Sequence, residues 1–281
     1  MTTRALVVAL ALPAVAVPAF AQRWHTLDAS RQLRDTLPVT VRVEYGAGKF
    51  ELRPGAAPLL YLMHLKYDAD RAEPVTRFDS AARTLALGIR SHGLRLSSSD
   101  QEGGTLHAEL TARAPMALAL ELGAVEADLQ LGGLRLTDLS LKGGAADVTV
   151  RFDERNPERL HAMTLDVGAA AVKIRRAGNS GVEQVRANVG AGALDLDLGG
   201  GDSAHDVEVS ANVAMGNFTL RVPPGVGVSI DATTFLASFD KAGLVKRGDR
   251  WNTPNFDAAA RKVRVRVRTV LGGFRLARDA R

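Results

Sequence analysis

The chain has 281 residues, of which 46% are hydrophobic and only 5% aromatic, so a core must be built mainly from Val, Leu and Ala. Cys is absent, which excludes thiol catalysis, Cys-ligated zinc, disulfides and the acylated cysteine of bacterial lipoproteins. The formal net charge of +5 is a mild excess that favours solubility and does not indicate a nucleic-acid-binding protein.

The first 21 residues have the pattern of a signal peptide. Arg4 supplies the positive start, Ala5 to Val17 is apolar, and Ala19-Phe20-Ala21 fits the small-x-small cleavage rule. The apolar run is too short to span a bilayer well, which disfavours an uncleaved membrane anchor. We expect residues 1–21 to be removed, leaving a bacterial protein of the periplasm or the exterior with no transmembrane segment.

A corner of small residues followed by an apolar-polar-apolar step recurs along the chain. The first apolar residue after each corner recurs every 21 to 24 residues between positions 127 and 239, the range typical of stacked repeats. Clear copies are Gly46–Leu52, Gly144–Val150, Gly168–Ile174 and Gly190–Leu196. Weaker copies are Ala214–Leu220 and Leu271–Leu276, and degenerate ones are Gly123–Leu129 and Phe235–Phe239.

Each repeat is interpreted as strand, corner, strand and turn. Alternating apolar and polar residues place one face of each strand inward, and stacked units bury a continuous core that one unit alone cannot. Two architectures fit: a β-solenoid of parallel coils, and an antiparallel sandwich in which each corner is a hairpin. The corners lack the Asn-Gly type of hairpin signal, which favours the β-solenoid.

The region ahead of the regular stack has a different pattern. Strands are expected at Leu59–Tyr67, Val75–Phe78, Leu85–Ile89 and Thr105–Thr111, without the 22-residue corners. Asp28 to Leu37 is compatible with a short helix. We therefore predict an all-β fold with a signal peptide at 1–21, an N-terminal β subdomain at 22–117 and a repetitive strand stack at 118–281.

The last copy carries a row of cations. Lys262, Arg264, Arg266 and Arg268 alternate with Val263, Val265 and Val267, so on a strand the cations point outward. One interpretation is an edge strand protected by charge against further pairing. The other is a cationic ladder that contacts phosphate or carboxylate groups of an envelope surface.

The run from Tyr45 to Leu52, YGAGKFEL, followed by apolar Leu59–Tyr67 and serial Gly-Ala corners, resembles the bacterial toastrack envelope proteins. These include the extracellular domains of cell-wall-active antibiotic response (LiaF-type) proteins and adhesin-like relatives. The resemblance extends from about Val39 to Leu276. It implies a repetitive all-β domain with a role in envelope-stress sensing or adhesion, and it supplies no catalytic residues. LiaF-type proteins carry transmembrane helices ahead of this domain, whereas this chain has only the predicted signal peptide.

The sequence contains few motifs typical of metal binding or catalysis. No two of His25, His64, His92, His107, His161 and His205 have metal-ligand spacing. Gly201-Asp202-Ser203 near His205 resembles a hydrolase motif, but the alternating helices and strands that hold such a triad are lacking, so a Gly-rich turn is preferred.

An acidic run of Asp195, Asp197, Asp202, Asp206 and Glu208 leaves a calcium site open as an alternative, although the calcium-binding nonapeptide does not repeat. The outward residues after the corners form no carboxylate cluster: Thr149, Lys173, Asp195, Thr219 and Arg275.

We therefore predict a non-enzymatic envelope protein, a binding, adhesion or envelope-stress module, without metal or cofactor. The alternative is a carbohydrate-active β-helix enzyme, a lyase or glycosidase, which needs a pair of carboxylates in one pocket. The expected partner is an envelope component or another protein rather than nucleic acid. Self-association through the end strands is a further possibility.

Overall fold

The computed structural model describes residues 23–56, 58–91, 103–201 and 205–278. The predicted signal peptide lies outside these residues. Within them, the chain is built from β-strands and a single short 3-10 turn, η1 (Ala177–Ser180). None of the described segments forms a helix with the length and apolarity needed to cross a membrane.

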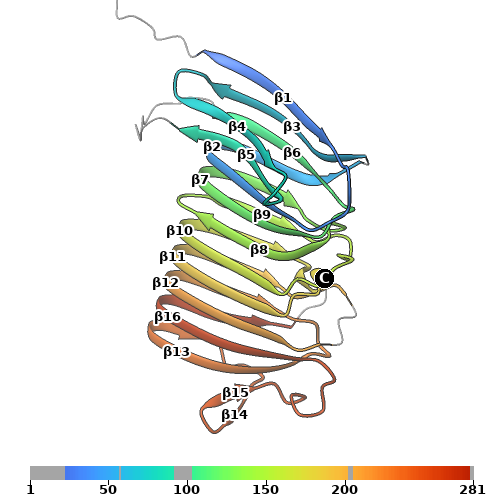
Figure 1. Cartoon of the computed structure of the whole chain (residues 1–281). Coiled ribbons are helices and arrows are strands. Elements are labelled where there is room, and N and C mark those ends of the chain that lie inside the picture. Colours follow the sequence, from blue (N-terminus) through green and yellow to red (C-terminus); the bar gives the residue numbers. More distant parts are fainter. Residues whose placement is uncertain (1–22, 57, 92–102, 202–204, 279–281) are drawn as a thin grey trace, which may run out of the picture.

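The second half is a stack of parallel strands that pair in register (Figure 1). The parallel pairing confirms the β-solenoid-like fold and rules out the sandwich of hairpins for this part of the chain. In spatial order the strands are β7 (Met116–Gln130), β8 (Leu136–Gly143) with β9 (Asp147–Arg151), β10 (Ala162–Arg175), β11 (Gln184–Asp197), β12 (Val207–Arg221), β16 (Lys262–Ala277) and β13 (Gly227–Phe239).

The small-residue corner lies inside these long strands. Each of β10, β11, β12 and β16 runs through the corner without a break, and only β8 and β9 are separate strands there. Gly216 shows why small residues are needed at the bend. Its φ is +136°, and a Cβ atom would lie 1.7 Å from the carbonyl oxygen of Gly192 on the next coil. The two halves of each strand therefore fold into two facing layers.

The N-terminal strands extend both layers. β2 (Val39–Gly55) pairs in parallel with β7 along both halves. Beyond β2 the layers separate: its first half pairs with β5 (Thr84–Ser91), which pairs with β4 (Ala72–Asp79). Its second half pairs with β6 (Gly104–Thr111), followed by β3 (Leu59–Asp68) and β1 (Trp24–Gln32). The division at residue 117 between an N-terminal β subdomain and a repetitive strand stack stays a prediction.

The expectation of a short helix from Asp28 to Leu37 is wrong. β1 pairs antiparallel with β3 over Trp24–Gln32, with Leu27 and Ala29 packed against the core. Leu27, Ala29 and Arg31 are partly covered, while Asp28 and Ser30 between them are exposed. This alternation matches a strand, and pairing with β3 overrides the weak local preference for a helix.

The expectation that the last copy is an edge strand is also wrong. β16 lies between β12 and β13 and pairs with both of them along nearly its whole length. After β13 the chain forms the small strands β14 (Val245–Arg247) and β15 (Arg250–Asn252), and then returns to insert beside β12. The edge at this end is formed by β13 and the β14–β15 hairpin.

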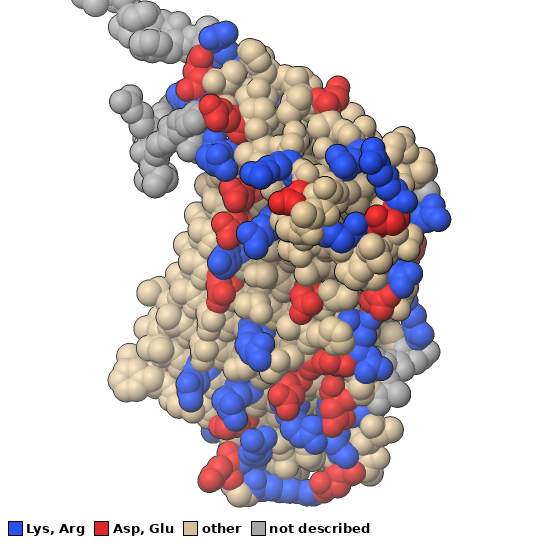
Figure 2. Space-filling model, viewed as in Figure 1, with Lys and Arg blue, Asp and Glu red and all other residues tan. Residues whose placement is uncertain are grey.

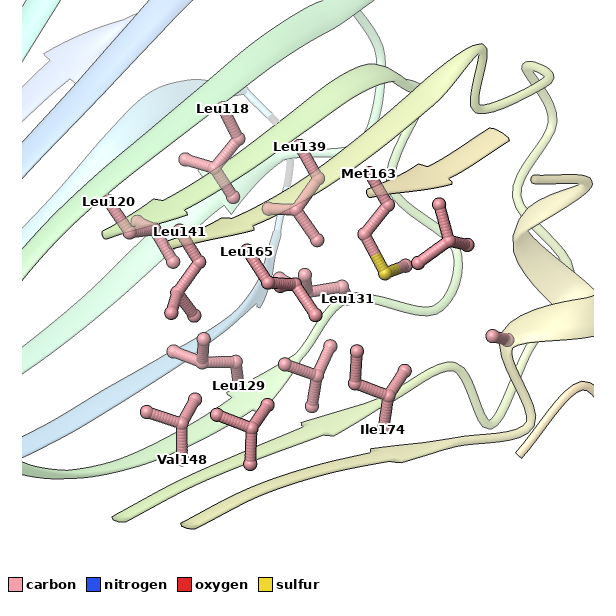
Figure 3. Close-up of a cluster of buried hydrophobic side chains, with 14 of the residues drawn as sticks. Leu118, Leu120, Leu129, Leu131, Leu139, Leu141, Val148, Met163, Leu165 and Ile174 are labelled. Carbon is pink, nitrogen blue, oxygen red and sulfur yellow. The ribbon is translucent and has the colours of Figure 1, made fainter. Parts of the chain in front are cut away.

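The core fills the space between the two layers. Figure 3 shows Leu118, Leu139 and Met163 on one layer facing Leu129, Val148 and Ile174 on the other. At the C-terminal end the core is aromatic: the ring centroids of Phe218 and Phe274 are 5.1 Å apart, and those of Phe274 and Phe239 are 5.3 Å apart. These rings lie in register on β12, β16 and β13, which shows what fixes β16 between its neighbours.

Candidate functional site

The cations predicted from the sequence stand in one row on the outer face of β16. Arg264, Arg266 and Arg268 are exposed, while the valines between them are buried. The register places Glu208, Ser210 and Asn212 of β12 beside these three arginines. The alternation along β16 therefore points the cations outward, as the sequence predicted, although β16 is an interior strand and not an edge strand.

Neighbouring groups contact Lys262 and Arg264 at the start of this row. Arg264 Nη1 lies 2.7 Å from Asp206 Oδ2, and the Lys262 backbone N–H donates to Asp206 Oδ1 at 3.0 Å. The Arg264 guanidinium, helped by the Lys262 amide, holds the pKa of Asp206 below its usual value. Lys262 Nζ also lies over the Phe256 ring, 5.9 Å from its centroid.

The end of the row is less constrained. Arg266 Nε is 3.8 Å from Asp231 Oδ2, a loose contact. The side chain of Arg268 has no hydrogen-bond or ion-pair partner in the described part of the chain. Arg268 also continues a polar row across the stack, in which Asn212 donates to Asn188 at 2.9 Å and Asn188 donates to Asp166 at 2.6 Å. Its guanidinium is available to an external anion.

A groove of about 240 Å³ runs beside the row, and it gathers cations from three strands. Arg186 of β11, Ser210 of β12 and Arg266 of β16 are in register across it, and Arg250 of β15 also lines it. Glu208 is the acidic residue in the lining. Sequence reasoning missed Arg186 and Arg250. Aligning the repeats would have placed Arg186 in the same column as Arg266.

A second groove, of about 410 Å³, lies on the outer face of the other layer, and several carboxylates line it. Asp195 and Asp197 of β11 line it together with Asp153, Lys173 and Arg175. Asp195 Oδ1 accepts a hydrogen bond from Arg221 Nε at 3.1 Å, and Asp197 accepts the Gly199 N–H at 2.7 Å. The carboxylates are thus already engaged by protein donors.

The remaining sequence candidates are scattered. His64, His107 and His161 each contact one exposed carboxylate, and His205 Nε2 lies 3.1 Å from the Gly181 carbonyl oxygen. His92, Asp202 and Ser203 lie outside the described residues. Among the residues that are described, no group of three or more His or acidic side chains is arranged to hold a metal ion.

The corner presents a feature that the sequence reading did not single out. Five large apolar side chains are exposed there on three adjacent strands, and we call them the corner ridge. They are Met215 of β12 (56% exposed), Val270 (52%) and Leu271 (47%) of β16, and Phe235 (78%) and Leu236 (67%) of β13. In Figure 2 the left edge beside the lower coils is tan, with blue side chains on the adjoining face.

Comparisons with known proteins identify one family and a set of distant structures. A family model described as the N-terminal domain of toast_rack, DUF2154, matches residues 25–175, more than half of the chain. No curated protein matches the chain.

Two solved structures are similar over nearly their whole lengths. One is a proposed cell adhesion protein from Clostridium sporogenes ATCC 15579, at 12% identity and a TM-score of 0.47, covering 92% of this chain and 100% of that one. The other is a proposed adhesin from Bacteroides fragilis NCTC 9343, at 8% identity and a TM-score of 0.48, covering 91% and 98%.

Proposed function

The chain belongs to the toast_rack family, and from this membership we propose that it is a non-enzymatic module of the bacterial cell envelope that binds anionic envelope components. The proposal includes export by the signal sequence at residues 1–21. The binding surface is the outer face of β16 with the groove beside it. The ligand chemistry is a phosphate or carboxylate group presented repeatedly along a polymer or surface.

The observation that carries the proposal is the excess of cations on this face. The side chains of Arg186, Arg250 and Arg268 have no hydrogen-bond or ion-pair partner among the described residues, and the side chain of Arg266 has only its loose contact with Asp231. A guanidinium presents a planar fork of donors that matches phosphate and carboxylate oxygens. Strands of one sheet lie about 4.8 Å apart, so the register of Arg186 and Arg266 on either side of Ser210 suits an extended, repeating anion.

The test is a pull-down on isolated bacterial envelope at several salt concentrations. The variant Arg186→Gln/Arg266→Gln/Arg268→Gln is expected to lose binding about tenfold, with a weaker dependence on salt, because exposed ionic contacts are screened. The matched control is Arg34→Gln/Arg77→Gln/Arg175→Gln, which removes the same charge from exposed positions elsewhere. Equal binding by the two variants would reject the proposal.

The carbohydrate-active alternative rests on the groove that contains Asp195 and Asp197. A general acid of a glycosidase needs a carboxyl group in surroundings that favour its protonated form, such as an apolar pocket. Here Lys173, Arg175 and Arg221 line the same groove. Bond cleavage in a panel of envelope polysaccharides that disappears in Asp195→Asn/Asp197→Asn, but persists in the matched pair Asp138→Asn/Asp166→Asn, would replace the binding proposal by this one.

A further inference from the structure

The corner ridge is the end point of a gradual change across the stack. Two outward positions occur at every corner. The first position holds Gly in the N-terminal and middle coils and then Ala, Val and Phe: Gly46, Gly123, Gly144, Gly168, Gly190, Ala214, Val270, Phe235. The second position holds Ala and then Met and Leu: Ala47, Ala124, Ala145, Ala169, Ala191, Met215, Leu271, Leu236.

The fold does not account for the large side chains. The same bend is made by Gly-Ala in five coils, and the core contacts come from other residues of each strand. Seven large hydrophobic side chains are exposed in the described residues, and five of them form the ridge. Isolated exposed apolar residues are ordinary, but a contiguous set on adjacent strands marks an interaction surface.

The charge nearest to the ridge is positive. The three ridge segments, 212–217, 232–238 and 268–273, contain no acidic residue, and Arg268 is their single charged residue. Arg266 follows next along β16 on the same outward face, with Asp231 of β13 in loose contact beside it. At the N-terminal corners, in contrast, carboxylates flank the bend, as with Glu44 and Glu121. A partner of the ridge therefore has an apolar part next to an anionic part.

The size of the ridge favours a lipid surface over a protein. Five half-exposed side chains of this type present on the order of 500 Å², below the roughly 800 Å² per partner that a stable protein interface buries. Both outward positions of the ridge lie at the bend, and Val270 also lines a mostly apolar groove that contains Arg268. A protruding apolar edge flanked by cations matches the boundary between acyl chains and anionic headgroups.

We propose that the corner ridge inserts into the surface of an anionic lipid bilayer, with Phe235 and Leu236 entering the acyl boundary and Arg266 and Arg268 meeting lipid phosphates. This inference rests on the proposed function for the role of the arginines and names the lipid bilayer as the envelope component. The stack would then meet the membrane along the ends of its C-terminal coils.

The experiment is co-sedimentation of the mature chain with vesicles of phosphatidylcholine containing about 30% phosphatidylglycerol, a composition that supplies an anionic surface. The variant Phe235→Ser/Leu236→Ser is expected to lose vesicle binding about tenfold or more. The matched control is Leu37→Ser/Val245→Ser, which removes the other two exposed large apolar side chains and should bind as the unmodified chain does.

A second measurement reports insertion directly. Phe235→Trp places an indole at the most exposed ridge position, and its emission should shift to the blue when vesicles are added, relative to the unmodified chain with Trp24 and Trp251. This readout remains if the double serine variant does not fold.

Three results would overturn the inference. They are vesicle binding unchanged by the ridge substitutions, no blue shift at position 235, and a concentration-dependent dimer in sedimentation that only the ridge variant loses. If envelope binding needs the arginines while vesicles are ignored, the proposed function survives and the ridge inference fails. If vesicles bind through the ridge with no contribution from Arg186, Arg266 and Arg268, the anionic part of both proposals fails.

Discussion

The corners at the two ends of the stack are made by the same repeat and differ in what they expose. At the N-terminal end a Cβ atom on Gly123 would lie 2.1 Å from the Gly46 carbonyl oxygen, so the coils are too close for any side chain. At the C-terminal end the equivalent positions accept Val270 and Phe235. The first outward position of the corner therefore excludes a Cβ atom at Gly123 and accepts one on β16 and β13, although the coils stay close there, since a Cβ on Gly272 would lie 1.9 Å from the Gly216 carbonyl oxygen.

The first prediction places a side chain of the kind found at the C-terminal corners at an N-terminal corner. Gly123→Val is expected to lower the free energy of unfolding by about 3 kcal/mol, because the new atoms meet backbone that cannot move aside. Urea denaturation measures the change. Ala124→Val, at the exposed neighbouring position, is the control and should change stability by less than about 0.5 kcal/mol. A loss below about 1 kcal/mol for Gly123→Val would mean that the glycines are not required by close approach.

The second prediction extends the ridge by two coils. Ala169 and Ala191 stand in the same column as Met215 and Leu271, and Ala169 is exposed. The variant Ala169→Leu/Ala191→Leu should fold with a stability change below about 1 kcal/mol, because the new side chains project outward. Its binding to anionic vesicles should rise several-fold if the ridge inserts into lipid. Co-sedimentation is the measurement, and Ala124→Leu/Ala145→Leu, far from the cationic row, should give a smaller gain.

The third prediction separates the ridge from the core. Phe235→Ala should change the free energy of unfolding by less than about 0.5 kcal/mol, because Phe235 is 78% exposed. Phe274, on the neighbouring coil, lies four residues after Val270, the equivalent of Phe235, and its ring is buried between those of Phe218 and Phe239, so Phe274→Ala should cost about 3–5 kcal/mol. A comparable loss in both variants, measured by thermal unfolding, would show that Phe235 serves folding.

The regular part of the fold could be predicted because its causes are local. Alternation from Met163 to Val167 and the small residues at Gly168–Ala171 specify a strand, a bend and another strand, and the constant period specifies parallel stacking. The place of β16 could not be predicted in this way. Its alternation of Val and Arg gives an inward face that fits any position in the stack, and long-range packing of Phe274 between two other rings decides which position it takes.

The candidate surface was predicted only in part, for a related reason. Alternation identified the outward row Arg264–Arg268, but the neighbours that complete the surface, Arg186 and Arg250, come from strands brought together by pairing. The ridge escaped because its two outward positions are consecutive, which breaks alternation and makes Val270 and Leu271 look like core residues. An alignment of the corners would have shown that Val270 and Leu271 occupy the positions that hold Gly and Ala in the earlier coils.

The smallest expected effect concerns the charge that holds the start of β16. The pKa of Asp206 is lowered in the folded chain, so its ionised form stabilises the fold above the ordinary Asp range, and this contribution is lost as pH falls through the lowered pKa. The side chains of this ion pair are about 40% exposed, so the pair contributes less than about 1 kcal/mol to the free energy of unfolding. Asp206→Asn should therefore be slightly less stable at pH 7, and its stability should converge with that of the unmodified chain as the pH falls below the lowered pKa of Asp206.

Asp206→Asn also tests how the pairing of cations with carboxylates on the outer face differs between the two ends of the stack. At the N-terminal end Lys142 lies 3.6 Å from Glu121 on the neighbouring strand, so cation and carboxylate match. Asp206 provides the same match for Arg264, and its removal should free this cation and raise envelope binding at pH 7 up to about twofold, an increase that added salt abolishes. In Arg264→Gln the further change Asp206→Asn should leave binding unaltered. If Asp206→Asn instead weakens binding, Arg264 acts only when Asp206 holds it in place, and the row binds through a fixed geometry more than through its net charge.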